Sequence, residues 1–224
     1  RRMMGRVHTP RPDPVAPLLS VNVTADLHRG EKWTGSMRRS GIDKRPVAGP
    51  RLLADHAVRG DSVINRVHHG GPWQAVYAYA REDARWWEQE LGIPIGNGRF
   101  GENLTTEGLD ITNAVIGERW RIGSAILQVS VPRIPCRTFA AFWERPGLIK
   151  AFTAARRPGA YLSIVEEGHI SAGEAIEVIE RPAGAATIVQ AFACKTGDRQ
   201  YLDLLRSTPD LAPQWRDWLG SIGS

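Results

Sequence analysis

A single cysteine between two arginines is the residue of this chain whose type and setting most suggest chemistry. Cys136 lies in "SVPRIPCRTFAAFW", residues 130–143, between Arg133 and Arg137. A thiolate is both a good nucleophile and a good metal ligand, and neighbouring cations favour it over the thiol. An isolated cysteine is more often a small apolar residue in a core. This stretch alone leaves both interpretations open.

A glycine pair marks a second candidate stretch, "RVHHGGPWQAVY" at residues 66–77. Gly70 and Gly71 permit positive φ angles and a close approach of the backbone to a ligand. Successive N–H groups in such a turn can bind an anion, and His68 and His69 would add donors. The alternative is an ordinary glycine turn before a strand.

Polar side chains also gather in "RFGENLTTEGLD", residues 99–110. Glu102 can accept hydrogen bonds from an amine or an arginine. The short side chains suited to hydrogen-bonding an anionic ligand are those of Asn103, Thr105 and Thr106. The alternative is a strand end followed by a capped turn. The pair Lys44 and Arg45 in "SGIDKRPV" is a weaker signal, because basic pairs in loops are usually solvated.

Several familiar catalytic and metal motifs are absent from the sequence. It contains no C-x-x-C, no H-E-x-x-H and no G-x-S-x-G. "GNGRFG" at residues 96–101 lacks the βαβ unit that a dinucleotide site requires. The two cysteines do not make a disulfide framework, and Cys194, which lacks the flanking arginines and companion stretches of Cys136, is expected to be a structural thiol. Arg133, beside Cys136, can grip a phosphate with two hydrogen bonds.

Composition indicates an ordinary globular protein. The chain has 224 residues, 42% apolar and 24% charged, with a formal net charge of +5. Clustered basic residues with stacking aromatics are absent, so no nucleic-acid partner is expected. No run of about 18 apolar residues occurs, so no membrane partner is expected either. The basic, proline-rich residues 1–17 lack a secretory h-region and are expected to be a disordered leader, which favours a cytoplasmic location.

Hydrophobic patterns predict a body rich in strands. Apolar and polar residues alternate along "GERWRIGSAILQVSVP", residues 117–132, around a turn at Gly123, which predicts a hairpin. Further strands are expected at residues 18–23, 74–80, 160–165 and 174–180. Helices are expected at residues 81–92 and 146–159. Strands this close together favour a closed or partly closed barrel, so the fold class is expected to be mainly β with some α.

The sequence changes character near residue 182. Apolar stripes at helical spacing follow, at Tyr201, Leu204 and Leu205, and at Trp215, Trp218, Leu219 and Ile222. We therefore expect a leader at 1–17, a barrel domain at 18–181 and a small helical segment at 182–224. The two tryptophans would either pack this segment onto the barrel or form a docking surface.

Taken together, the motifs resemble a known family. The order of "SGIDKRPV", "RGD", "HHGGPWQAVYAY", "FGENLTTEGL" and "IGERWRIGSAILQVSVPRIPC" resembles a stand-alone bacterial protein of the MOSC family (molybdenum cofactor sulfurase C-terminal domain). The resemblance covers most of the chain and is greatest to the subgroup with a C-terminal three-helix segment. It implies a β-barrel-like domain.

The resemblance also implies a cofactor. The family cysteine matches Cys136, which would supply a thiolate to the metal of a molybdenum cofactor, a molybdopterin. Soft thiolate ligands suit such a metal. The residues expected around this cofactor are Lys44, His69, Gly70, Gly71, Glu102, Asn103, Thr105 and Arg133. We expect Cys136 to share one pocket with Arg133, Asn103 and the glycine turn.

The implied activity is the detoxifying reduction of small N-hydroxylated compounds such as hydroxylaminopurines and amidoximes. Electrons would come from a separate flavin or iron–sulfur protein. The family is also linked to sulfur transfer and to pyridoxal phosphate enzymes, so a non-catalytic cofactor carrier or sulfur-relay module is the alternative. One departure concerns Asn65, which stands where relatives often have a second acid after "RGD".

Overall fold

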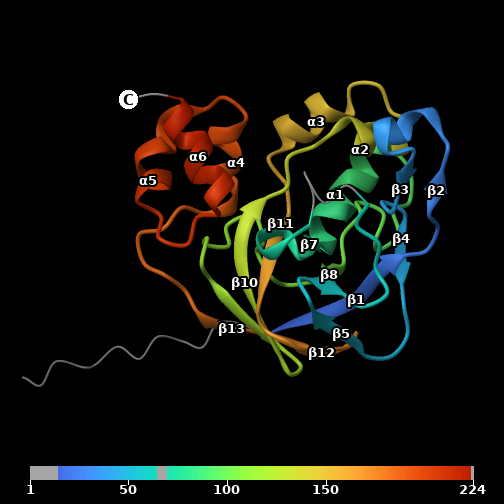
Figure 1. Ribbon diagram of the computed structural model, residues 1–224, viewed down its shortest axis with the longest axis horizontal. Coiled ribbons are helices and arrows are strands. Elements are labelled where there is room, and N and C mark those ends of the chain that lie inside the picture. The colour runs from blue at the N-terminus through green and yellow to red at the C-terminus, as the bar shows by residue number, and fades with distance from the viewer. Residues whose placement is uncertain (1–14, 65–69, 223–224) are drawn as a thin grey trace, which may run out of the picture.

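The computed structural model describes residues 15–64 and 70–222, and its centre is a closed barrel of seven strands (Figure 1). Around the barrel, β1 pairs with β13, and the order then runs β9, β10, β11, β7, β8 and back to β1. The pairs are antiparallel except β7–β8. The strands are β1 (Ala16–Thr24), β7 (Val76–Ala80), β8 (Leu104–Thr106), β9 (Arg119–Ile122), β10 (Ala125–Pro132), β11 (Ala160–Glu166) and β13 (Ala175–Glu180). The predicted class, mainly β with some α, is confirmed.

Short strands extend the barrel on one side. β4 (Lys44–Pro46) pairs with the end of β1. β2 (His28–Arg29) and β3 (Arg39–Ser40) form a two-stranded ribbon whose connection contains the 3-10 helix η1 (Lys32–Met37). A separate sheet contains β5 (Arg51–Ala54), β6 (Ala57–Val58) and β12 (Gly168–Ile170). β4 and the β2–β3 ribbon border the site described below.

The β9–β10 hairpin follows the predicted alternation. Trp120 on β9 and Leu127 on β10 face each other in register and are fully buried, whereas Arg121 is exposed. Pro132 ends β10, because proline has no N–H to donate to a further ladder bond. The end of β10 thus places the following residues, including Cys136, at the rim of the barrel.

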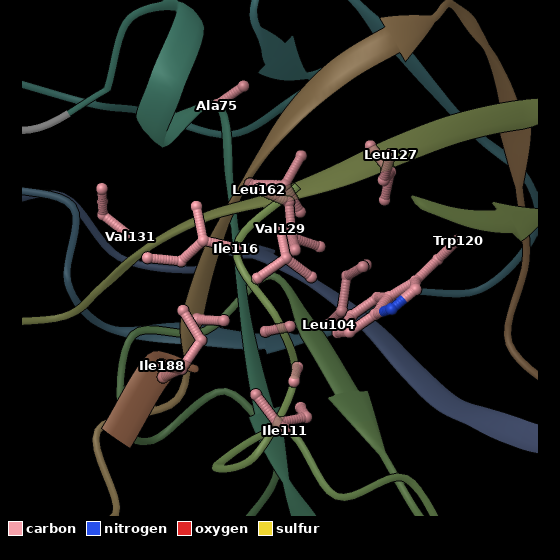
Figure 2. Close-up of a cluster of buried hydrophobic side chains, with 14 of the residues drawn as sticks. Ala75, Leu104, Ile111, Ile116, Trp120, Leu127, Val129, Val131, Leu162 and Ile188 are labelled. Carbon is pink, nitrogen blue, oxygen red and sulfur yellow. The ribbon is translucent and has the colours of Figure 1, made fainter. Parts of the chain in front are cut away.

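A single large hydrophobic cluster fills the barrel. Figure 2 shows side chains from several strands converging on its centre, among them Leu104, Trp120, Val129 and Leu162. Each of these four is fully buried. Interiors of this kind are packed as densely as organic crystals, so the barrel is a rigid support for residues at its rim.

A second, aromatic cluster lies between the barrel and three helices. These are α1 (Arg81–Leu91), α2 (Arg137–Phe142) and α3 (Leu148–Ala155). α1 ends where predicted, at Gly92, whose φ of 67° forms a left-handed cap. Trp87, Phe100, Phe139 and Phe152 pack together at its centre, with the Trp87 and Phe152 rings 5.9 Å apart and stacked. This cluster joins α2, and hence the segment after β10, to the loop before β8.

The C-terminal segment is helical, with α4 (Ile188–Lys195), η3 (Arg199–Tyr201), α5 (Leu202–Ser207) and α6 (Pro213–Ser221). In Figure 1 these helices lie together on one side of the barrel. Thr187 and Gln190 form a capping box at the start of α4. Ile188 and Trp215 belong to the same hydrophobic cluster as the barrel interior. The segment therefore shares the barrel's core instead of having one of its own.

The burial of two tryptophans and of Cys194 bears on two expectations about the C-terminal segment. Trp215 is 5% exposed and Trp218 is partly buried, so these rings pack within the molecule. Cys194 on α4 is buried, and burial raises the pKa of its thiol, as befits a structural cysteine. No helix in the described part of the chain is both long and apolar enough to span a bilayer.

Candidate functional site

A pocket of about 150 Å³ opens beside the barrel rim, where the end of β10, the β3–β4 connection and η2 (Pro72–Gln74) meet. Of the residues predicted for a binding site, the structure brings together Lys44, Gly70, Asn103, Arg133 and Cys136 on its wall. These residues come from segments far apart in the sequence. The expected grouping of Cys136 with Arg133, Asn103 and the glycine turn is therefore found, while the binding roles themselves remain predictions.

Cys136 lies four residues after the last residue of β10 and directly before α2. Its side chain is half-buried, and its residue has extended backbone angles. Pro132 and Pro135 restrict the connecting segment, because each fixes its own φ angle. The short stretch between a rigid strand and a packed helix holds the thiol at the pocket wall.

Arg133 is a buried cation of this pocket, with 5% of its surface exposed. Its Nη1 donates a hydrogen bond to the carbonyl oxygen of Phe100, and its guanidinium lies 4.3 Å from the centre of the Phe139 ring. Its Nε is buried and has no hydrogen-bond partner among the described residues. A buried polar group without a partner is costly, so this N–H indicates a place for an acceptor that the chain itself does not provide.

The surroundings of Arg133 favour its charge. Burial by itself lowers the pKa of Arg133, but the polar atoms of the nearby Tyr77, Tyr161 and Cys136 side chains favour the cation, and the net shift is upward. Burial in turn raises the pKa of both tyrosines, so they stay neutral. The pocket therefore combines a permanent cation with a thiol, and no Asp or Glu is among the described residues that line it. An anionic ligand would complement this arrangement.

Lys44, the first residue of β4, forms a buried ion pair with Asp61 on the same side of the pocket. Asp61 also accepts hydrogen bonds from the Thr24 hydroxyl at 2.8 Å and from Asn103 Nδ2 at 2.8 Å. Burial raises the pKa of Asp61, but the lysine and these hydrogen-bond donors lower it by more than burial raises it. The net shift of the pKa is therefore downward. Burial lowers the pKa of Lys44, which Asp61 only partly opposes. The ion pair with Asp61 thus fixes Lys44 on the pocket wall.

Asn103 joins this wall to the barrel. Its Oδ1 accepts from the backbone N–H of Tyr77 at 3.1 Å, and its Nδ2 donates to Asp61 and to the carbonyl of Asn22. Both N–H bonds of the amide are thereby used within the protein, since a primary amide has two donors. Asn103 lines the pocket, but only a lone pair on Oδ1 remains for a ligand.

Glu102 and Thr105 were expected to contact the ligand, and the structure places neither on the pocket wall. Glu102 is 1% exposed and accepts hydrogen bonds from the N–H groups of Gly98 and Phe100, at 2.6 and 2.9 Å, and from Thr105. Burial raises the pKa of Glu102 to about 6, against these donors. Its carboxylate thus holds the loop that supplies the Phe100 carbonyl to Arg133, and supports the site from behind.

The glycine turn is only partly described. Gly70 has φ 80° and lies on the pocket wall. Gly71 has φ 79° and precedes η2, and it is not among the residues that line the pocket. His69, a predicted cofactor contact, and Asn65, the departure from the family pattern, lie outside the described residues. For the described glycines, the positive φ explains why this residue type stands there.

Sequence reasoning did not single out Asp61, Gln74, Tyr77 or Tyr161 as site residues. Tyr77 and Tyr161 line the pocket near Arg133, and Gln74 lines it with a buried Oε1 that has no partner within the described part of the chain. "RGD" drew attention to Asp61 only as a motif fragment. Its role depends on Lys44, 17 residues earlier, which no local pattern reveals.

The donor set tests whether a molybdenum cofactor suits this pocket. Within the described ranges, no group of three or more His, Cys, Asp and Glu residues could hold a metal ion. A metal here would bring most of its ligands with it and take one thiolate from the protein. The unpartnered Nε of Arg133 and Oε1 of Gln74 offer a donor for an anionic group and an acceptor for a ring N–H. These residues fit a cofactor of that kind.

Comparison with known proteins agrees with the fold and shows the family. A model of the MOSC domain matches residues 65–177, which include Asn103, Arg133 and Cys136. Uncharacterized protein YflK of Bacillus subtilis (strain 168) is 32% identical over 188 residues, which are 83% of this chain and 85% of that protein. The crystal structure of YiiM from Geobacillus stearothermophilus superposes with a TM-score of 0.76 at 30% identity and covers 92% of this chain and 98% of that one.

A protein named "Reductase" from Gibberella moniliformis (strain M3125 / FGSC 7600) is 30% identical over 148 residues. The match covers 64% of this chain but 26% of the fungal protein. The similar part is therefore one portion of a larger protein.

Proposed function

This chain belongs to the MOSC domain family, and we propose that it binds a molybdenum cofactor and reduces small N-hydroxylated compounds such as hydroxylaminopurines and amidoximes. The observation that carries the proposal is the presence of the Cys136 thiol and the buried cation Arg133 in one pocket. The similarity to a protein named reductase is consistent with redox chemistry.

In this proposal the chain holds the cofactor through three kinds of contact. Cys136 supplies a thiolate to the molybdenum, since soft ligands suit such a centre. Arg133 donates its unused Nε–H to an anionic group of the cofactor, such as its phosphate, and charge-assisted bonds of this type are strong. Gln74 accepts from the pterin, and Gly70 lets the backbone come close.

When bound, the cofactor supplies two electrons to the N–O bond, which with two protons yields the amine and water. The chain contributes orientation and a proton source. Lys44 carries a proton at Nζ on the pocket wall, held in place by Asp61. A positioned acid of this sort typically contributes about 10²–10⁴-fold to a proton transfer. A separate flavin or iron–sulfur protein would return the electrons.

The test is a reduction assay with a chemical electron source, which needs no partner protein. The chain is produced in a host that makes the cofactor, mixed with reduced methyl viologen and 6-hydroxylaminopurine, and the adenine formed is measured by chromatography. We expect turnover in the wild type and in Cys194→Ser, and its loss in Cys136→Ser. Bound cofactor without turnover in the wild type would contradict the proposal and favour the non-catalytic carrier.

A further inference from the structure

The β2–β3 ribbon presents two arginines side by side to solvent. In the register of this ribbon Arg29 stands directly opposite Arg39, and both are exposed. The residues on the other face turn inward, since the His28 ring lies 5.1 Å from the ring of Trp33 and Ser40 is buried. Directly opposed residues of two strands point to the same face, so the two guanidinium groups share the outer one.

The opposed arginines make the β2–β3 ribbon less stable. Like charges directly across a strand pair are destabilising. The adjacent Arg38 is exposed as well and has a φ of 53°, a left-handed conformation that is unfavourable for a non-glycine residue. Arg29, Arg38 and Arg39 form no ion pair with any acid in the described residues. The structure thus keeps three unneutralised cations at one edge.

Two of the acids near the ribbon are already engaged. From His28 to Arg39 the sequence has Glu31 as its one acid, and this carboxylate lies 3.1 Å from Nδ1 of His28. Asp43, just beyond the ribbon, pairs with Arg45 at 3.3 Å. Residues 28–40 therefore carry more positive than negative charge, and Asp26 just before them forms no ion pair with the three arginines among the described residues.

One of the three arginines, Arg39, also borders the pocket. Arg39 and Thr34 lie on its wall, and Thr138 of α2 lies on it from the other side. η1 packs against α2, so that the ribbon stands beside α2 at the upper right of Figure 1. We call Arg29, Arg38 and Arg39 the arginine rim. A partner that reaches for the pocket from solvent meets this rim first.

We propose that the arginine rim is the docking surface for an acidic face of the electron-donor protein. This inference rests on the proposed function, because only a redox reaction at the pocket needs such a donor. A protein fits the rim better than a small anion does, because small ligands bind in concave sites, whereas Arg29 and Arg38 lie outside the pocket lining and all three side chains are exposed. Complementary charge chiefly accelerates and orients encounter, and salt weakens it.

The first test measures binding without any cofactor. The probe is plant-type ferredoxin, a small acidic iron–sulfur protein, titrated into the cofactor-free chain by calorimetry at 20 and 300 mM NaCl. The variant is Arg29→Glu/Arg38→Glu, neither of which lines the pocket. The matched control is Arg51→Glu/Arg59→Glu, which makes the same change in charge on and beside the β5–β6 sheet, away from the pocket wall.

We expect the rim variant to bind ferredoxin at least about tenfold more weakly at low salt, and the control less than about twofold more weakly. High salt should remove the difference. Equal binding by the two variants, or no binding by the wild type at 20 mM NaCl, would overturn the inference.

The second test separates this inference from the proposed function. The cofactor-loaded rim variant should reduce 6-hydroxylaminopurine at the wild-type rate with reduced methyl viologen, and at least about tenfold more slowly with reduced ferredoxin. Equal slowing with both donors would overturn docking as the role of the rim. Rim-dependent ferredoxin binding without any reduction by methyl viologen would instead refute the proposed activity, and with it the electron-transfer role of the surface.

Discussion

Replacing Asp61 with alanine removes the carboxylate that neutralises a buried lysine in the pocket wall. The side chains of Asp61 and Lys44 are 3% and 8% exposed. Thr24 and Asn103 also lose an acceptor, although Asn103 keeps its bond to the Asn22 carbonyl. An ammonium left in this setting has neither a counter-ion nor full hydration.

The size of the effect follows from this burial. Breaking a buried ion pair by removing one partner typically costs about 3–5 kcal/mol, because an uncompensated charge is left behind. We expect Asp61→Ala to lower the free energy of unfolding by that amount. Removing both charges, in Lys44→Met/Asp61→Ala, should cost less than the single change. The matched control is Asp55→Ala, whose partner Arg59 is exposed and whose loss should cost about 1 kcal/mol or less.

The assay is urea unfolding of the cofactor-free chain, followed by tryptophan fluorescence at pH 7 and at pH 3. Because the pKa of Asp61 is lowered in the fold, its stabilisation is present above its unfolded value of 3.8 and is lost as the pH falls through the folded pKa. The difference between wild type and Asp61→Ala should therefore shrink at pH 3. A difference below about 1 kcal/mol at pH 7, equal to that of Asp55→Ala, would refute the reasoning.

Two further predictions concern the loop behind the pocket. Gly98→Ala should destabilise the fold by about 2–4 kcal/mol, because Gly98 has φ 88° and an added Cβ would lie 2.4 Å from the Lys44 carbonyl oxygen. Gly96→Ala is the control, because an added Cβ there meets open space, and its free energy of unfolding should stay within about 0.5 kcal/mol of the wild type. Equal losses of stability in the two variants, measured by urea unfolding, would contradict this prediction. The pKa of Glu102 is raised from 4.5 to about 6 in the fold. The stabilisation that its protonated form gives to the folded state is therefore fully present below pH 4.5 and is lost as the pH rises through 6, a change of about 2 kcal/mol in the free energy of unfolding. Glu102→Gln should remove that slope from the stability curve between pH 4.5 and 6.5, and an unchanged slope would contradict the assignment.

Local patterns predicted much of the barrel. The alternation around Gly123 predicted the β9–β10 hairpin, and apolar spacing with a final glycine predicted α1. Both signals depend on neighbouring residues alone, so they need no knowledge of the fold. The position of Cys136 after a strand end was readable for the same reason.

Contacts between distant segments could not be read in this way. Glu102 was expected at the ligand, yet its carboxylate binds the backbone of its own loop. A carboxylate in a polar stretch has the same sequence signature in both cases. Asp61 and Lys44 meet only because β4 pairs with β1 and the "RGD" turn returns beside it. Apolar residues at helical spacing after residue 182 predicted helices. This spacing identifies the buried face of a helix but not the part of the protein against which that face packs.

The molybdenum content of the purified chain tests the central claim most directly. Wild type, Cys136→Ser and Cys194→Ser would be produced in one cofactor-making host and measured by mass spectrometry of the metal, with the pterin measured by fluorescence. Cys194→Ser places a hydroxyl in the core and so bears the larger folding cost. We predict that Cys194→Ser retains the wild-type content of metal and pterin, and that Cys136→Ser loses at least about nine-tenths of the metal, in keeping with the tenfold or greater effect of disturbing a ligand. Equal metal in all three proteins would contradict the role of Cys136 as the molybdenum ligand.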